Sequence, residues 1–191
     1  MKYDKSFLRK RALLQRKKKY KSIKNYNFNF NLIFKLIKKN FLNKKINIAG
    51  YYPANHEVDI IKFLEKASQK NFKLSLPVIG PSSSMHFYSW IFKDPLYLNS
   101  FGILEPKKYH KEVIPDLIIV PLVAFDKKLN RIGYGKGYYD RILNKIKKIK
   151  KKTIFLGIAY SFQKCSIIPT NKYDFKLDYI FTERGIISSN Y

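Results

Sequence analysis

Leu117-Ile-Ile-Val-Pro-Leu-Val-Ala-Phe-Asp-Lys-Lys-Leu-Asn-Arg-Ile-Gly-Tyr-Gly-Lys-Gly-Tyr-Tyr-Asp-Arg141 is the stretch that decides the fold. Its first four residues form an unbroken apolar run, which is typical of a strand buried on both faces. A polar, turn-like segment, residues 126–130, precedes three glycines at alternate positions, 133, 135 and 137. Apolar residues then repeat at helical spacing among lysines, at Tyr139, Ile142, Leu143, Ile146 and Ile149. The stretch therefore predicts a buried strand, a glycine-rich loop and a helix.

The glycine-rich loop has the composition of an anion-binding site. Glycines allow close approach of the backbone and positive φ, and free N–H groups at the start of the next helix point toward a ligand. Lys136 and Arg131 add positive charge, and Asp140, in the first helical turn, could hold a divalent cation. Two structural explanations stay open. The glycines could form only a tight turn, and Asp140 could serve only the helix dipole.

The composition describes one folded domain, residues 1–191, with an extreme positive charge. The length suffices for a substantial core, and 46% hydrophobic residues exclude a disordered chain. The net charge of +26 would suit a nucleic acid or an anionic membrane. However, the charge is nearly all lysine and is scattered along the chain, whereas nucleic-acid readers favour arginine. We attribute the charge to compositional drift and expect no specific nucleic-acid partner.

The remaining bulk features favour a cytoplasmic monomer without membrane contact. Cys165 is the single cysteine, so an intrachain disulfide is impossible. The basic N-terminus lacks a continuous apolar segment of the signal-peptide type. The longest apolar run, residues 117–125, is interrupted by Pro121 and is too short to span a bilayer.

A longer and more specific pattern surrounds the glycines. It consists of Pro115-Asp-Leu-Ile-Ile-Val-Pro121, Ala124-Phe-Asp126, Asn130-Arg131 and Gly133-Tyr-Gly-Lys-Gly-Tyr-Tyr-Asp140. The pattern closely resembles the signature of the 5-formyltetrahydrofolate cyclo-ligase (5,10-methenyltetrahydrofolate synthetase) family. The resemblance runs from Lys5 to about Thr182. It departs at Leu129, where glycine is frequent, and at Ile60, where threonine is frequent.

The resemblance implies a ligase that forms a C–N bond in a ring. The reaction would convert 5-formyltetrahydrofolate, with or without a polyglutamate tail, and ATP into 5,10-methenyltetrahydrofolate, ADP and phosphate, with Mg²⁺ as cofactor. Lys5 and Arg9, four residues apart on one helical face, would contact ATP phosphates. The implied ATP site comprises Lys5, Arg9, Arg131, Ile132, Gly133, Tyr134, Gly135, Lys136, Gly137, Tyr138 and Tyr139, with Lys136, Arg131 and Tyr139 as catalytic residues.

The same resemblance implies a folate site and a metal site. The folate site would comprise Tyr52, Glu57, Met85, Phe101 and Tyr138. The metal ligands would be Asp140 and Asp174, although Asp178 is close enough in sequence to keep the second assignment open. Structural explanations remain here too: Glu57 could be a helix-start acid, and Met85 could fill the core.

Strands that alternate with helices predict an α/β fold, a three-layer α/β/α sandwich around a mainly parallel sheet. The resemblance implies an architecture similar to sugar-phosphate isomerase and deaminase folds. We expect helices at residues 2–20, 30–41, 58–67 and 138–149, and strands at residues 46–52, 73–78, 85–92, 117–120 and 153–159, with a last strand at 179–182. Two other functions stay open: an isomerase- or deaminase-like enzyme without ATP, and a basic RNA-associated protein with steep salt dependence.

Overall fold

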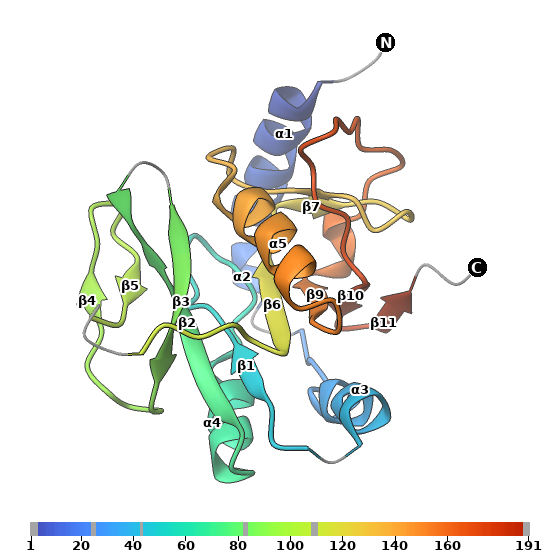
Figure 1. The fold of residues 1–191 in the computed structure, drawn as a ribbon. Coiled ribbons are helices and arrows are strands. Elements are labelled where there is room, and N and C mark those ends of the chain that lie inside the picture. Colours follow the sequence, from blue (N-terminus) through green and yellow to red (C-terminus); the bar gives the residue numbers. More distant parts are fainter. Residues whose placement is uncertain (1–3, 24–25, 43, 82–83, 108–110, 189–191) are drawn as a thin grey trace.

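The computed structural model describes residues 4–23, 26–42, 44–81, 84–107 and 111–188, so the first residues of the helix expected at 2–20 lie outside it. The described residues form a seven-stranded sheet and two two-stranded ribbons (Figure 1). No helix among them is both long enough and apolar enough to cross a bilayer. The elements are α1 (Lys5–Lys18), α2 (Tyr20–Ile23), α3 (Asn31–Phe41), β1 (Asn47–Ala49), α4 (Ile61–Gln69), β2 (Lys73–Ile79), β3 (Met85–Trp90), β4 (Tyr97–Leu98), β5 (Leu104–Glu105), β6 (Leu117–Pro121), β7 (Ala124–Phe125), β8 (Arg131–Ile132), α5 (Tyr138–Ile149), β9 (Ile154–Ile158), the 3-10 helix η2 (Ser161–Gln163), β10 (Tyr179–Thr182) and β11 (Gly185–Ser188).

The main sheet has the strand order β11-β10-β9-β6-β1-β2-β3. Its five inner strands run parallel, whereas β11 and β3 pair antiparallel at the two edges. Strand β6 lies at the centre, between β1 and β9. Its first four residues, 117–120, have no exposed surface. The buried strand and the mainly parallel sheet predicted from the sequence are therefore confirmed.

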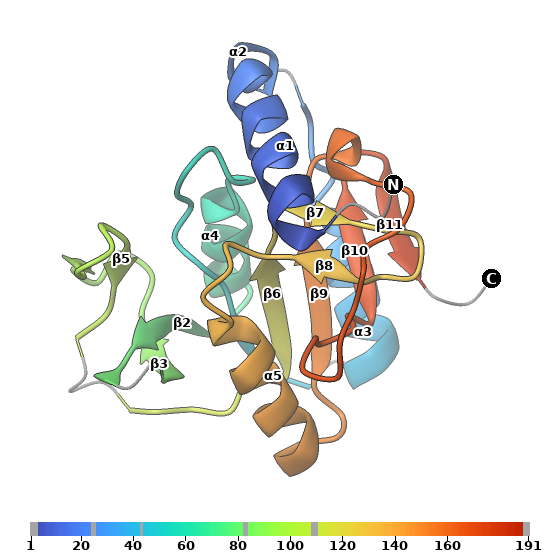
Figure 2. The same cartoon turned by 90° about the horizontal axis from the view of Figure 1, so that it is seen from above.

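Strand β6 separates two apolar cores because successive side chains point to opposite faces of a sheet. Leu117 and Ile119 pack in the core that contains α3 and α4. Ile118 and Val120 pack instead with the buried residues of α5. Figure 2 shows α4 and α5 on opposite sides of β6. This arrangement confirms the predicted three-layer α/β/α sandwich.

Helix α1 lies outside these layers, beside the β7–β8 ribbon (Figure 2). Its Ala12 packs in a small apolar cluster with Val123, Ala124 and Ile132 of the ribbon. The Asp4 carboxylate caps the helix, because it accepts a hydrogen bond from the N–H of Phe7 at 2.7 Å. The ribbon leads directly into the glycine-rich loop, so α1 is placed next to that loop.

The direction in which successive strands are added to the sheet reverses between β1 and β6. Strand β1 is followed by α4 and β2 on one side, whereas β6 is followed by β9 and β10 on the other. The loops that leave these two neighbouring strands therefore diverge. In open α/β sheets, ligands bind in the crevice outside the carboxyl ends of the strands at such a switch point. The fold thus places residues 50–60 and the glycine-rich loop around one crevice.

Several element boundaries differ from the sequence predictions. The helix expected at 58–67 begins only at Ile61, and β1 is confined to residues 47–49. The strand at 179–182 is not the last, because the chain turns back at Gly185 (φ 122°) and forms β11. The β4–β5 and β7–β8 ribbons were not predicted. Their strands have two residues each, which is too short for an alternating pattern to be detected.

The family pattern often has glycine at the position of Leu129. The backbone conformation at this position explains that preference. Its φ is 66°, in the left-handed region that favours glycine. Its side chain, however, has no exposed surface and packs in the same core as α5. Left-handed backbone costs an L-residue roughly 1–2 kcal/mol, whereas a buried leucine side chain contributes about 2–5 kcal/mol. Burial outweighs the strain, so leucine is tolerated here.

This balance predicts an order of stability at position 129. Leu129→Gly should lower the free energy of unfolding by about 1–3 kcal/mol, because it relieves the strain but loses the packing. Leu129→Ala should be less stable still, since it loses the packing and keeps the strain. Chemical denaturation of the three proteins measures the order. An alanine variant more stable than the glycine variant would contradict the account.

Candidate active site

The crevice at the switch point is a cavity of about 1090 Å³. That volume slightly exceeds the usual range for small-molecule sites, about 300–1,000 Å³, so the cavity has room for more than one ligand. Every residue implied by the family resemblance lines it: Lys5, Arg9, Tyr52, Glu57, Met85, Phe101, Arg131, Ile132, Gly133, Tyr134, Gly135, Lys136, Gly137, Tyr138, Tyr139, Asp140 and Asp174. The structure thus brings together residues that lie up to 169 positions apart in the sequence.

The glycine-rich loop uses positive φ at two of its three glycines. Gly135 and Gly137 have φ values of 99° and 68°, whereas Gly133 is not in the left-handed region. Gly137 is the N-cap of α5 and provides no side chain to cap it. The first N–H groups of α5 are therefore available to a ligand in the cavity. A β-carbon on Gly135 would lie 3.3 Å from Cζ of Arg9, so glycine here also makes room for that arginine.

Helix α1 contributes cations from one face. The ammonium of Lys5 pairs with the carboxylate of Asp174, and Nε of Arg9 donates to the carbonyl oxygen of Gly133 at 2.7 Å. Arg16 follows Lys5 by eleven residues, which is about three helical turns, and so projects from the same face. Arg16 was missed in the sequence analysis. Its spacing from Lys5 and Arg9 was the signal that could have identified it.

Arg131 is buried beside the cavity with incomplete hydrogen bonding. Only 6% of the residue is exposed, and its Nη2 lies 2.9 Å from Oδ1 of Asp140. That contact is an ion pair, but its direction is not that of a hydrogen bond. Nε and Nη2 have no hydrogen-bond partner among the described residues. Buried donors without acceptors are costly, and an anion in the cavity would supply the acceptor.

The two carboxylates implied as metal ligands each face a cation. Asp140 pairs with Arg131 and accepts a hydrogen bond from the N–H of Phe175 at 3.1 Å. Asp174 pairs with Lys5 and accepts from the N–H of Asn171 at 2.6 Å. The described residues contain no group of three or more His, Cys, Asp or Glu side chains that could hold a metal. The pair fits Mg²⁺, which usually takes one or two carboxylates and completes its shell with phosphate oxygens and waters.

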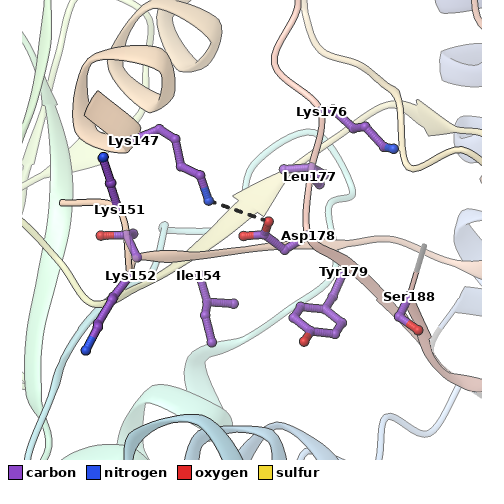
Figure 3. Close-up of a pocket in the computed structure, with 10 residues that line it drawn as sticks. Lys147, Lys151, Lys152, Ile154, Lys176, Leu177, Asp178, Tyr179 and Ser188 are labelled. Carbon is purple, nitrogen blue, oxygen red and sulfur yellow. Dashed lines mark ion pairs between the residues drawn. The ribbon is translucent and has the colours of Figure 1, made fainter. Parts of the chain in front are cut away.

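Asp178 lines a second hollow instead (Figure 3). It measures about 410 Å³, and lysines 147, 151, 152 and 176 line it. Asp178 lies there, 3.9 Å from Nζ of Lys147, and accepts from the N–H of Phe155 at 2.9 Å. Asp178 does not line the main cavity, whereas Asp174 does. Asp174 thus shares the cavity with Asp140, whereas Asp178 does not; the role of Asp174 as a metal ligand stays a prediction.

Glu57 is held at the β1 side of the cavity. It lies three residues before Ile60, the N-cap of α4, so it is not a helix-start acid. Its carboxylate accepts from the N–H of Ala54 at 2.9 Å, and the hydroxyl of Tyr134 lies near it. Burial raises the pKa of Glu57, whereas the Ala54 and Tyr134 hydrogen bonds and the charge of Arg16 lower it. These contacts oppose the effect of burial on a carboxylate that faces the cavity.

Aromatic and apolar side chains form a wall of the same cavity. Met85 is 6% exposed, and the rings of Phe101 and Tyr138 meet edge to face with 6.1 Å between their centroids. Nζ of Lys136 lies 5.8 Å from the centre of the Phe101 ring. Burial raises the pKa of Tyr139, so its phenol is neutral at physiological pH. The wall can cover a flat ring while the neighbouring carboxylate binds the edge of that ring.

Some lining residues differ from expectation. The side chain of Ile132 packs in the cluster beneath α1 and is 1% exposed, so it contributes little to the binding of a ligand.

Glu105 lines the cavity and was not predicted, because the β4–β5 ribbon is too short to show an alternating sequence pattern. Its Oε2 accepts from the N–H of Ile79 at 3.1 Å and from Nδ2 of Asn99 at 2.9 Å, which joins the ribbon to β2. Arg141 was also missed, although its place after Asp140 was a visible signal.

Comparisons with known proteins agree with the geometry. A family model described as the 5-formyltetrahydrofolate cyclo-ligase family matches residues 1–183. The 5-formyltetrahydrofolate cyclo-ligase of Haemophilus influenzae is 36% identical over 137 residues, 69% of this chain and 72% of the relative. That of Mycoplasma pneumoniae is 32% identical over 196 residues, 94% of this chain and 99% of the relative.

Solved structures give the same result. The 5,10-methenyltetrahydrofolate synthetase of Aquifex aeolicus, determined by NMR, matches with a TM-score of 0.74 and 29% identity, over 98% of this chain and 93% of that chain. The synthetase of Mycoplasma pneumoniae matches with a TM-score of 0.67 and 25% identity, over 98% and 100%. The chain therefore belongs to the 5-formyltetrahydrofolate cyclo-ligase family of enzymes.

Proposed function

We propose that this enzyme cyclises 5-formyltetrahydrofolate to 5,10-methenyltetrahydrofolate with ATP and Mg²⁺, and releases ADP and phosphate. The observation that carries the proposal is the composition of one cavity. A cationic glycine-rich loop, a partly buried carboxylate and an aromatic wall all line it. A sugar-phosphate isomerase or deaminase would need the first feature but has no use for a second site that fits a flat heterocycle.

The phosphates of ATP would bind at the glycine-rich loop. The N–H groups of the loop and of the first turn of α5 are suited to phosphate oxygens. Arg131 has buried donors that lack acceptors, and Lys136 lines the same part of the cavity. From α1, Arg9 reaches the loop and Lys5 reaches Asp174 in the same cavity. Together these groups offset the charge of a triphosphate.

Asp140 and Asp174 would hold Mg²⁺ together with the phosphate oxygens. When bound, the ion would neutralise negative charge that develops on the transferring phosphoryl group. In the protein alone, Arg131 and Lys5 balance the same two carboxylates. These ion pairs orient both carboxylates before any ligand arrives.

The pterin ring of the folate would bind at the other end. A pterin carries an amino group next to a ring N–H, and a carboxylate such as that of Glu57 can accept from both. Tyr52, Met85, Phe101 and Tyr138 would enclose the ring. Glu57 binds such paired donors best when it is ionised, so the contacts that lower its pKa against burial favour folate binding.

The reaction follows from the proximity of the two ends. The formyl oxygen on N5 attacks the terminal phosphorus of ATP and ADP leaves, which converts a poor leaving group into phosphate. N10 then attacks the activated carbon, its proton is lost and phosphate departs. Such chemistry depends mainly on positioning and on neutralisation of charge. We assign these tasks to Lys136 and Arg131, with the neutral phenol of Tyr139 beside them.

Other expectations from the sequence stay predictions. They are the single domain, the cytoplasmic location, the monomeric state, the binding of polyglutamylated folate and the lack of a specific nucleic-acid partner. The second hollow is lined by lysines near Asp178, and its lining includes no arginine. This arrangement gives no support to the alternative of an RNA-associated protein.

The proposed activity has a direct assay. Purified protein incubated with 5-formyltetrahydrofolate, ATP and Mg²⁺ should produce the absorbance of the methenyl product, because phosphorylation makes the formyl oxygen a leaving group. Omission of ATP or chelation of Mg²⁺ should abolish the signal. Equal product formation without ATP would show that the activation step is not the one proposed here.

The two metal-binding acids can be tested against Asp178. Asp140→Asn and Asp174→Asn should lower turnover by orders of magnitude across a Mg²⁺ titration, since the phosphoryl group loses a charged clamp. Asp140→Asn should also lower the free energy of unfolding by about 1–3 kcal/mol, because the buried Arg131 loses its counter-charge.

Asp178→Asn is the matched control. It removes a carboxylate of the same kind that pairs with a lysine and accepts a backbone N–H, but in the second hollow. Its turnover should equal that of the unmodified enzyme at each Mg²⁺ concentration. If the three variants retain equal turnover, neither Asp140 nor Asp174 holds the metal.

A further inference from the structure

Arg16 has a buried guanidinium, and none of the ligand contacts proposed above involves it. It is 2% exposed. Its Nη1 donates to the carbonyl oxygen of Leu122 at 3.4 Å, and its Nη2 donates to the hydroxyl of Tyr134. Its Cζ lies 5.6 Å from the centre of the Tyr134 ring, which adds a cation–π contact. Burial of an arginine is costly unless it is well partnered, and these partners lead toward the cavity.

The hydroxyl of Tyr134 joins Arg16 to Glu57. The tyrosine oxygen accepts from Arg16, and its hydroxyl lowers the pKa of Glu57, which is the effect of a donor that faces a carboxylate. The result is a directed chain from a buried cation, through a neutral hydroxyl, to an acid. It starts on α1, passes through the glycine-rich loop and ends in the loop after β1.

The hydrogen bond from Arg16 to the backbone carbonyl of Leu122 does not explain the presence of an arginine at this position. The carbonyl of Leu122 also accepts from Nε2 of Gln163, at 3.1 Å. That carbonyl would keep a hydrogen bond if Arg16 were replaced. The contact that has no substitute is the one with Tyr134, and through it with Glu57.

We propose that Arg16 and Tyr134 are positioning residues that hold the carboxylate of Glu57 charged and in one orientation toward the bound folate. The inference rests on the proposed function of Glu57 as the acid that binds the pterin. It adds a link between the two ends of the cavity, because Tyr134 belongs to the loop that would bind ATP. Neither residue has to touch the pterin to affect its binding.

The charges around Glu57 determine the expected pH dependence. Burial raises the pKa of Glu57, and Arg16 is the cation whose charge lowers it. The other titratable groups that interact with Glu57 are phenols whose pKa is raised by burial, so they are neutral near physiological pH: Tyr51, Tyr134, Tyr139 and Tyr160. Loss of the Arg16 charge or of the Tyr134 hydroxyl removes an influence that lowers the pKa of Glu57. The pKa then rises, and a larger fraction of Glu57 is protonated at neutral pH.

The test is the affinity for 5-formyltetrahydrofolate, measured without ATP across pH. Tyr134→Phe removes only the hydroxyl and should weaken binding about tenfold, the size expected for a hydrogen bond to a charged group. The loss of affinity toward acidic pH should begin at a higher pH than in the unmodified enzyme. Arg16→Lys, which cannot keep both contacts of the guanidinium, should act in the same direction.

Each variant has a matched control: Arg11 lies on the same helix as Arg16, and Tyr97 has the same side chain as Tyr134. Arg11→Lys changes an exposed arginine of α1, and Tyr97→Phe removes an exposed hydroxyl outside the cavity. Both should leave folate affinity and its pH profile unchanged. A merely structural role for Arg16 or Tyr134 would lower the melting temperature without moving the pH profile.

A double-mutant cycle with Glu57→Gln separates this inference from the proposed function. In the Glu57→Gln background, Tyr134→Phe should cause no further loss of folate affinity. If Glu57→Gln itself leaves folate affinity unchanged, the proposed role of Glu57 fails, and this inference fails with it. If Glu57→Gln weakens binding while Tyr134→Phe does not, only the positioning inference is overturned.

Discussion

The contact between helix α1 and the glycine-rich loop sets where the charges of the cavity lie. Lys5 holds Asp174, Arg9 holds the carbonyl of Gly133, and Arg16 holds the hydroxyl of Tyr134. These cations project from one helical face, whereas Ala12 supplies the apolar contact beneath them. Because α1 lies outside the sandwich layers, polar contacts carry much of its orientation. A helix rotated about its axis would lose all of them together.

The same contacts explain how a strongly basic chain keeps acids in its ligand site. Three of its carboxylates have a nearby cation: Arg131 for Asp140, Lys5 for Asp174, and Arg16, beyond Tyr134, for Glu57. Charges that leave water are stabilised only when paired. Most of the 39 lysines and arginines do not line this cavity, and their origin in compositional drift stays a prediction.

The sequence was most informative where one strand and one helix are buried. The apolar run at 117–120 and the helical spacing after Gly137 predicted β6 and α5, and hence the layers and the position of the glycine-rich loop. It was least informative where a contact joins distant segments through side chains of ordinary type. Arg16 reads as one more basic residue of a basic helix, and Glu105 lies in a ribbon too short to show a pattern. Asp174 and Asp178 could be distinguished only by the pockets that they line.

The central claim is that one cavity binds folate at its β1 side and ATP at the glycine-rich loop. Amide hydrogen exchange with each ligand alone tests it directly, since a bound ligand slows local opening. Mg²⁺ with a non-hydrolysable ATP analogue should protect residues 131–141 and α1, and 5-formyltetrahydrofolate should protect residues 50–60. Protection by either ligand confined to the lysine-lined hollow of Figure 3 would contradict the account.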